Sequence, residues 1–502
     1  MPLSLWRMQA SPRQKVIQRN MRAPRYFHRY VDQDAHLQII DLYDDGSRER
    51  LYDSLDPRFV VSEPDSDYRG QQTLLSLLRM VDDLGARTAI VEPYIGTDWN
   101  EEFGHLYSRA FKITNPTTCR LHFFKSVDGE ALHQKDLFDV TQEVATAYLG
   151  YTVLRPIPAF RVSETMLQSP WTLPLGDGKN AYHMDLVHCQ VRRTVSLLGN
   201  ELTVRAMPFM QQDTSVAVCA AADLWMVARY ANLLGQAGRY RPAKITKMAT
   251  DSITVGSTRE GLIDLQILHA LKKMDLNPSR YTPKDPRDAV EFIFSCVESD
   301  IPVIAGIPDH VFVIIGHDYA TTITEDNLGV NISSLVESFI VHDDSAGPYL
   351  KKAIGVKETT TEAKVETTLL TLGGDQVVDF CVIAMPERVN LTRDDITKHT
   401  RNWLAFANDY VSADLGYPAE DLWDLTGIDE LVFRTYLRRC RDFKRDLLKG
   451  RVLRDAETIA KYRCTQMPKY VWVVEMARPA DLLGKNPHER KICGELLFDA
   501  TA

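Results

Sequence analysis

Apolar residues recur with helical spacing in some stretches of the first 200 residues and cluster in short strand-like runs in others. A spacing of three to four residues predicts helices over 73–84, 101–111 and 137–148. Runs rich in β-branched and aromatic residues predict strands over 88–92, 119–125 and 151–156. The pattern therefore predicts an N-terminal α/β domain over residues 35–200, to which no motif assigns a role.

The order of elements changes in the middle of the chain, residues 201–385. Helical patterns come first, at 219–234, 261–274 and 286–299. Strand patterns follow at 302–306, 310–317, 338–343 and 377–383, and the Thr- and Glu-rich residues 357–368 are expected to form an exposed hairpin or flap. Helices followed by strands within one unit predict an α+β domain.

The two ends of the chain have patterns of their own. Residues 386–502 are predicted to be helical as far as 462 and to end in two strands, 470–476 and 492–498. Residues 1–34 form a basic arm, with seven Lys and Arg residues and no acid before Asp32. Transit peptides are also Arg-rich and acid-poor, but we expect a solvated arm here.

Composition and charge exclude several classes of protein. A net charge of −9 over 502 residues argues against a general nucleic-acid binder. The sequence has no run of eighteen apolar residues, so we expect no membrane span, and it shows no apolar core of a secretory signal. The eight cysteines are scattered without Cys-x-x-Cys spacing, which favours a reducing, cytoplasmic location without structural zinc.

Cys219 is the first candidate for chemistry. The following residues, AAADLWMVARY, favour helix, and Thr214 or Ser215 could cap it, which would place Cys219 in the first turn. The free amide groups and dipole at a helix start favour the thiolate, which is the reactive form of cysteine. The competing interpretation is an inert thiol in a buried, Ala-rich helix.

His310 and two acids are the next candidates. His310 begins an almost fully apolar strand, where it could face a thiol at a helix start. His317 and His342 are rivals, although the odd spacing of His317 from His310 predicts that it lies on the opposite face of the strand. Asp343 or Asp344, at the end of the strand 338–343, could orient the imidazole; two turn acids are the alternative.

Two glutamines precede Cys219 by seven and eight residues. Acyl transfer needs donors for an oxyanion, and the side-chain amide of Gln212 or Gln211 could supply one. Other chemistries lack their motifs, because the sequence contains no P-loop, no G-x-G-x-x-G, no H-E-x-x-H and no G-x-S-x-G. The basic segment 434–451 reads as a solvated helix face that could bind an acidic partner.

Taken together, the order Gln, Cys at a helix start, His at a strand start and Asp at the next strand end resembles the bacteriocin-processing peptidases of the papain-like clan. HVFVIIGHD at 310–318 and PVIAGI at 302–307 are similar to the family's strands, and 261–274 is similar to its intervening helix. The resemblance covers about 140 residues. Ala220 replaces the family's usual Gly, and Asp344 replaces the usual Pro.

The resemblance implies a papain-like cysteine peptidase domain over 201–385 that hydrolyses a peptide bond through a thioacyl-enzyme. Cys219 would be the nucleophile, His310 the general base, Asp343 its orienting acid and Gln212 the oxyanion donor, with Asp344 and Gln211 as alternatives. No cofactor or metal is implied. The substrate would be a protein or peptide, and the terminal regions could bind a protein partner. Deamidation or acyl transfer by the same triad, and a catalytically inactive peptide-binding module, remain open.

Overall fold

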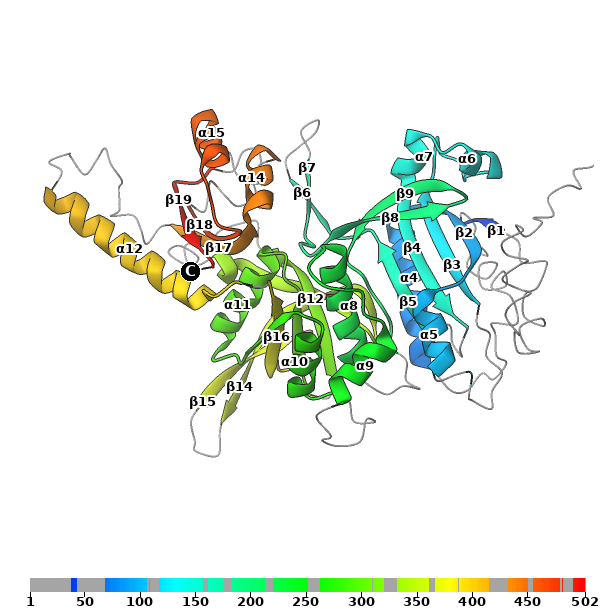
Figure 1. The fold of residues 1–502 in the computed structure, drawn as a ribbon, viewed down its shortest axis with the longest axis horizontal. Helices are drawn as coiled ribbons and strands as arrows, with labels where there is room; N and C mark the ends of the chain where they lie inside the picture. The colour runs from blue at the N-terminus through cyan, green and yellow to red at the C-terminus, as the bar shows by residue number, and fades with distance from the viewer. Residues whose placement is uncertain are drawn as a thin grey trace, which may run out of the picture.

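The computed structural model is of a mixed α/β protein with two large antiparallel sheets and a small third one (Figure 1). It describes residues 38–42, 68–105, 108, 117–156, 161–175, 182–212, 220–251, 262–308, 310–319, 332–360, 366–386, 388–414, 431–449, 455–478, 481 and 491–501. The predicted arm 1–34 and Cys219 lie outside these residues. None of the helices in the described ranges is both long and apolar enough to cross a membrane.

The N-terminal unit is a five-stranded sheet of consecutive antiparallel strands, drawn in blue and cyan in Figure 1. The strands are β1 (Gln38–Asp41), β2 (Ala86–Tyr94), β3 (Thr118–Lys125), β4 (Tyr148–Arg155) and β5 (Arg161–Leu167). The helices are α4 (Tyr68–Asp83), α5 (Thr97–His105), α6 (Gln134–Phe138) and α7 (Gln142–Ala147). The single helix predicted over 137–148 is thus two short ones, and the second begins at the N-cap Thr141.

Two hairpins join this unit to the rest of the chain. β6 (Thr172–Leu175) pairs with β7 (Tyr182–Asp185), and β8 (Val191–Leu197) pairs with β9 (Asn200–Ala206). The domain boundary predicted at 200/201 falls inside the second hairpin. One hydrophobic core also runs without interruption from Leu74 on α4 to Val382 in the next sheet.

The central sheet has seven strands in the order β10-β16-β11-β12-β13-β14-β15. Their bounds are β10 (Asn277–Tyr281), β11 (Val303–Ile307), β12 (His310–Tyr319), β13 (Val336–Asp343), β14 (Gly347–Thr360), β15 (Glu366–Leu372) and β16 (Phe380–Met385). β14 and β15 form the hairpin predicted from the Thr- and Glu-rich segment, although it extends further on both sides. The bounds of β11, β12 and β13 lie within two residues of those predicted, whereas β16 begins three residues later than the predicted strand 377–383.

Helices cover both faces of this sheet. α8 (Ala220–Leu233), α9 (Pro242–Thr250) and α10 (Asp264–Lys273) share a core with Val311, Val313 and Ile315. α11 (Pro286–Glu298) shares the other core with Phe312 and Ile314. The alternation along β12 therefore divides its side chains between two cores, as expected for a strand buried on both faces.

A β-bulge in β12 reverses that alternation. The pairing with β13 shifts between Ile314 and Gly316, so Ile315 is an extra residue. After the bulge, His317 packs against Phe294 on α11, on the same face as Phe312. The prediction that odd spacing would place His317 on the face opposite to His310 is wrong for this reason.

The C-terminal region contains a third sheet, β17 (Val432–Arg439), β18 (Tyr470–Ala477) and β19 (Gly494–Asp499). The prediction of helix as far as residue 462 is wrong at β17, which contributes Val432 and Leu437 to the core next to α11. The helices are α12 (Arg393–Asp414), α14 (Cys440–Lys449) and α15 (Ala456–Cys464). The basic segment predicted as one helix face is thus half strand and half helix.

Candidate active site

His310 and Asp343 meet where two neighbouring strands of the central sheet have their ends. His310 begins β12 and Asp343 ends β13, and the two strands are antiparallel, so both residues lie at the same end of the sheet. His310 Nε2 is 3.0 Å from Asp343 Oδ1, within hydrogen-bond distance. Nδ1 of His310 has no hydrogen bond to any residue in the described ranges, and the side chain is 20% exposed. Nδ1 is therefore the nitrogen that can accept a proton from outside the pair.

The Asp343 carboxylate is held in place by several donors. Oδ1 also accepts hydrogen bonds from the backbone N–H of Ser345 at 3.1 Å and of Ala346 at 3.2 Å, and from Ser345 Oγ at 2.7 Å. Lys352 Nζ on β14 lies 3.4 Å from Oδ2. Sequence reasoning did not identify Ser345 or Lys352; the SAG turn after the two acids was the available signal for Ser345.

These contacts shift both members of the pair. Burial disfavours the charged form of Asp343, but the hydrogen bond and charge of His310, Ser345 and Lys352 outweigh it, so the pKa of Asp343 is lowered. Burial lowers the pKa of His310, but the hydrogen bond and charge of Asp343 outweigh that effect, so the net shift is upward. The pair therefore favours an imidazolium next to a carboxylate.

Asp344 is in a different state from its neighbour. It is fully buried, and neither carboxyl oxygen has a hydrogen-bond partner among the described residues; Oδ1 is 3.8 Å from His310 Nε2. Burial and the adjacent negative charge of Asp343 raise the pKa of Asp344 to about 8. Asp344 is therefore largely protonated at pH 7, which favours Asp343 as the orienting acid.

The two glutamines have separate environments. Gln211 is 2% exposed; its Oε1 accepts from the backbone N–H of Val162, and its Nε2 donates to Thr73 Oγ1 on α4. Gln212 is half-buried, and its backbone N–H donates to the carbonyl oxygen of Asp344 at 3.3 Å. Gln212 therefore adjoins Asp344 through its backbone, whereas the side-chain amide of Gln211 is committed to Val162 and Thr73.

The described residues that follow Cys219 in the sequence form the expected helix. α8 begins at Ala220, the residue after Cys219, and is buried over most of its length. Four of the other seven cysteines, Cys119, Cys189, Cys296 and Cys381, are buried, and burial raises the pKa of all four thiols. Those four have the character of inert core thiols.

Neither rival histidine has the setting of a general base. His342 is fully buried with its ring edge-on to Phe209 and Tyr349, and burial lowers its pKa to about 3. His317 is also fully buried, and its Nε2 lies 2.8 Å from Glu298 on α11. Both residues belong to the interior of the sheet.

Two clusters have the residue types of a metal site. The ligand atoms of His310, Asp343 and Asp344 lie within 4.8 Å of one another, as do those of His188, Glu298 and His317. In the first cluster the Lys352 ammonium already neutralises Asp343, and Asp344 is protonated and contributes no negative charge. In the second, Arg434 binds Glu298 directly. The charges present in both clusters disfavour a divalent ion.

Comparison with known proteins adds little to this geometry. No protein-family model and no curated protein sequence matches the chain. Among solved structures, the crystal structure of UfSP from C. elegans aligns with 36% of this chain and 32% of its own, at 16% identity and a TM-score of 0.22. The chain thus spans about a third of that protein, and a similarity at this level carries no argument about fold or function.

Proposed function

We propose that the chain is a cysteine peptidase in which Cys219 is the nucleophile and His310 its general base. The observation that carries the proposal is the 3.0 Å contact between His310 Nε2 and Asp343 Oδ1, where β12 begins and β13 ends. This contact leaves Nδ1 of a partly exposed ring as the nitrogen that would take the thiol proton, and Asp343 would stabilise the imidazolium that results. An orienting acid, a base and a cysteine next to a helix start are the parts of a nucleophilic triad.

The chemistry needs only groups of this chain. His310 would accept the Cys219 proton, and the thiolate would attack a peptide carbonyl. The Gln212 amide and the Cys219 backbone N–H would donate to the oxyanion. The imidazolium, stabilised by Asp343, would protonate the leaving amine, and water would release the acyl group and regenerate the thiol.

The first test is the alkylation of Cys219 by iodoacetamide at pH 6, followed by peptide mass spectrometry. An ordinary thiol, with a pKa of about 8.5, is less than about 1% thiolate there, whereas a thiolate–imidazolium pair is fully reactive. We expect Cys219 to react at least about tenfold faster than the exposed Cys464 and Cys493 of the same chain. Equal rates for the three thiols would refute the nucleophile assignment.

The second test separates catalysis from docking. Peptides released from an unstructured protein mixture are counted for the wild type, Cys219→Ala and His310→Ala, with Cys464→Ala as the matched control. Loss of turnover in the first two variants alone supports hydrolysis. Release of ammonia without new peptide termini would indicate a deamidase, and turnover that survives both substitutions would contradict the mechanism.

A further inference from the structure

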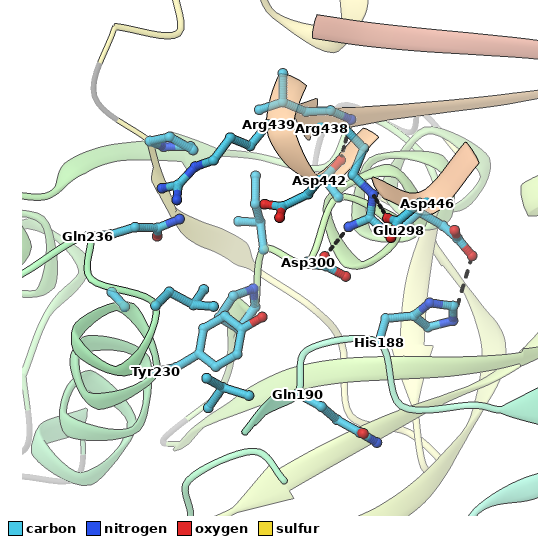
Figure 2. Close-up of a pocket in the computed structure, with 18 of the residues that line it drawn as sticks. His188, Gln190, Tyr230, Gln236, Glu298, Asp300, Arg438, Arg439, Asp442 and Asp446 are labelled. Carbon is cyan, nitrogen blue, oxygen red and sulfur yellow. Dashed lines mark hydrogen bonds and ion pairs between the residues drawn. The ribbon is translucent and has the colours of Figure 1, made fainter. Parts of the chain in front are cut away.

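A cavity of about 770 Å³ lies at the other end of the central sheet from His310 (Figure 2). Its walls come from the β8–β9 hairpin, the second half of α8, the start of β11 and the β17–α14 junction. It therefore lies where the C-terminal unit meets the central sheet. Its volume is in the range of small-molecule sites, which is roughly 300–1,000 Å³.

The charged residues around the cavity are unbalanced. The described lining includes seven arginines and five carboxylates, an excess of two positive charges. Each carboxylate has an arginine partner within 4.0 Å: the pairs are Asp185–Arg205, Glu298–Arg434, Asp300–Arg438, Asp442–Arg445 and Asp446–Arg445. Arg441 also has a carboxylate, that of Asp442 at 3.5 Å, so two of the seven arginines are left without one among the described residues.

Two guanidinium groups in the lining, those of Arg192 and Arg439, account for the excess of positive charge. Arg192 on β8 has no carboxylate within 4.0 Å among the described residues, and neither has Arg439 at the end of β17. The contact of the Arg439 guanidinium is with the hydroxyl of Tyr470 at 3.4 Å. Figure 2 shows the Arg439 side chain pointing toward Gln236 across the cavity.

Arg192 has another arginine as its cross-strand neighbour. It lies directly opposite Arg205 in the register of the β8–β9 hairpin, so two like charges share one face. Like charges directly opposite in an antiparallel pair destabilise the hairpin. Arg205 has Asp185 at 3.5 Å, so Arg192 is the arginine of this pair that is left to bind an anion, and guanidinium groups bind phosphate in bidentate geometry.

We propose that this cavity binds a phosphate-bearing small molecule, held by Arg192 and Arg439. Gln190, Gln236 and Tyr230 line the same space and offer hydrogen bonds to an uncharged part of the ligand. Because Arg192 belongs to the hairpin and Arg439 to the third sheet, the ligand would bridge the central and C-terminal units. This site is independent of the peptidase proposal.

Isothermal titration of the full chain with ATP and with inorganic pyrophosphate, at about 150 mM salt, tests the site. We expect binding by both, and roughly tenfold weaker binding in Arg192→Gln and in Arg439→Gln, from the loss of a charge-assisted contact. The matched control is Arg401→Gln, an exposed arginine on α12, which should bind as the wild type does.

Citrate at matched ionic strength distinguishes a phosphate site from a carboxylate site. Binding of citrate as tight as that of ATP and pyrophosphate would overturn the proposal. A loss of affinity in Arg401→Gln equal to that in the two test variants would also overturn it, and so would the absence of binding by both phosphates. A melting temperature without ligand provides a second measurement. Arg192→Gln should melt no lower than the wild type, because it removes the repulsion with Arg205; a lower melting temperature would mean that Arg192 is a structural residue.

Discussion

The most informative perturbation of the candidate site is Asp343→Asn. Asparagine keeps the size of the side chain and an oxygen that can accept from the N–H groups of Ser345 and Ala346, but it removes the negative charge next to His310. At 3.0 Å and an effective dielectric constant of about 20, a carboxylate and an imidazolium attract by about 5.5 kcal/mol. Lys352, at 3.4 Å from Asp343, shares that negative charge, and the amide of the variant can still hydrogen-bond to His310. We therefore take about half of the attraction, 2–3 kcal/mol, as the loss in the variant.

A loss of that size predicts a drop of about 30- to 150-fold in the thiolate–imidazolium population. The measurement is the second-order rate of Cys219 alkylation by iodoacetamide between pH 5 and 10. The defect should be full at pH 6, where the reactive form requires the imidazolium. It should disappear above the pKa of the thiol, where thiolate forms without a charged partner.

The matched control for this variant is Asp344→Asn. Burial keeps Asp344 largely protonated at neutral pH, so the amide replaces a neutral group, and alkylation at pH 6 should change less than about threefold. The reasoning is wrong if Asp343→Asn reacts within threefold of the wild type at pH 6, or if Asp344→Asn is the more damaging variant.

Three further perturbations test other parts of the structure. The raised pKa of Asp344 means that the folded state holds a proton that the unfolded state releases. The free energy of unfolding of the wild type, relative to that of Asp344→Asn, should therefore fall as pH rises from about 4 to 8, by at most about 1.4 kcal/mol per pH unit. Urea titrations of both proteins across this range measure the difference. Gly316→Ala should lower stability by several kcal/mol, because a Cβ would collide with the backbone oxygen of Leu186. The control Gly104→Ala, on the helix α5, meets no atom within 4 Å and should not lower the melting temperature. Glu298→Gln should lower the free energy of unfolding by about 3 kcal/mol, because the buried Arg434 loses one of its two carboxylates. The control is Glu457→Gln, at an exposed position. Equal denaturation midpoints for the two variants would contradict the role of this ion pair.

Local pattern was enough to predict the elements that carry the candidate site. His310 begins one apolar run and Asp343 ends another, and short runs of β-branched and aromatic residues of this length are typical of buried strands. The sequence could not reveal the bulge at Ile315, because the extra residue is apolar like its neighbours and only pairing with β13 exposes it. That single residue moved His317 to the other face.

Long-range contacts were beyond the reach of the sequence. The segment of β17 was predicted as part of a solvated helix. Arg434 and Arg438 are instead buried, and each forms an ion pair with a carboxylate far away in the chain, Glu298 and Asp300. The choice between Gln211 and Gln212 likewise depends on Thr73, which is 138 residues from Gln211. Propensity carries no information about partners at that separation.

The Thr73 contacts make the N-terminal unit part of the candidate site. Thr73 Oγ1 receives the Gln211 amide and donates to the carbonyl oxygen of Ser345, in the turn that holds Asp343. A fragment beginning at residue 201 would lose this clamp and cut the β8–β9 hairpin. Any fragment that keeps the site intact must therefore include α4, and a loosening of α4 would reach His310 through the turn at Ser345.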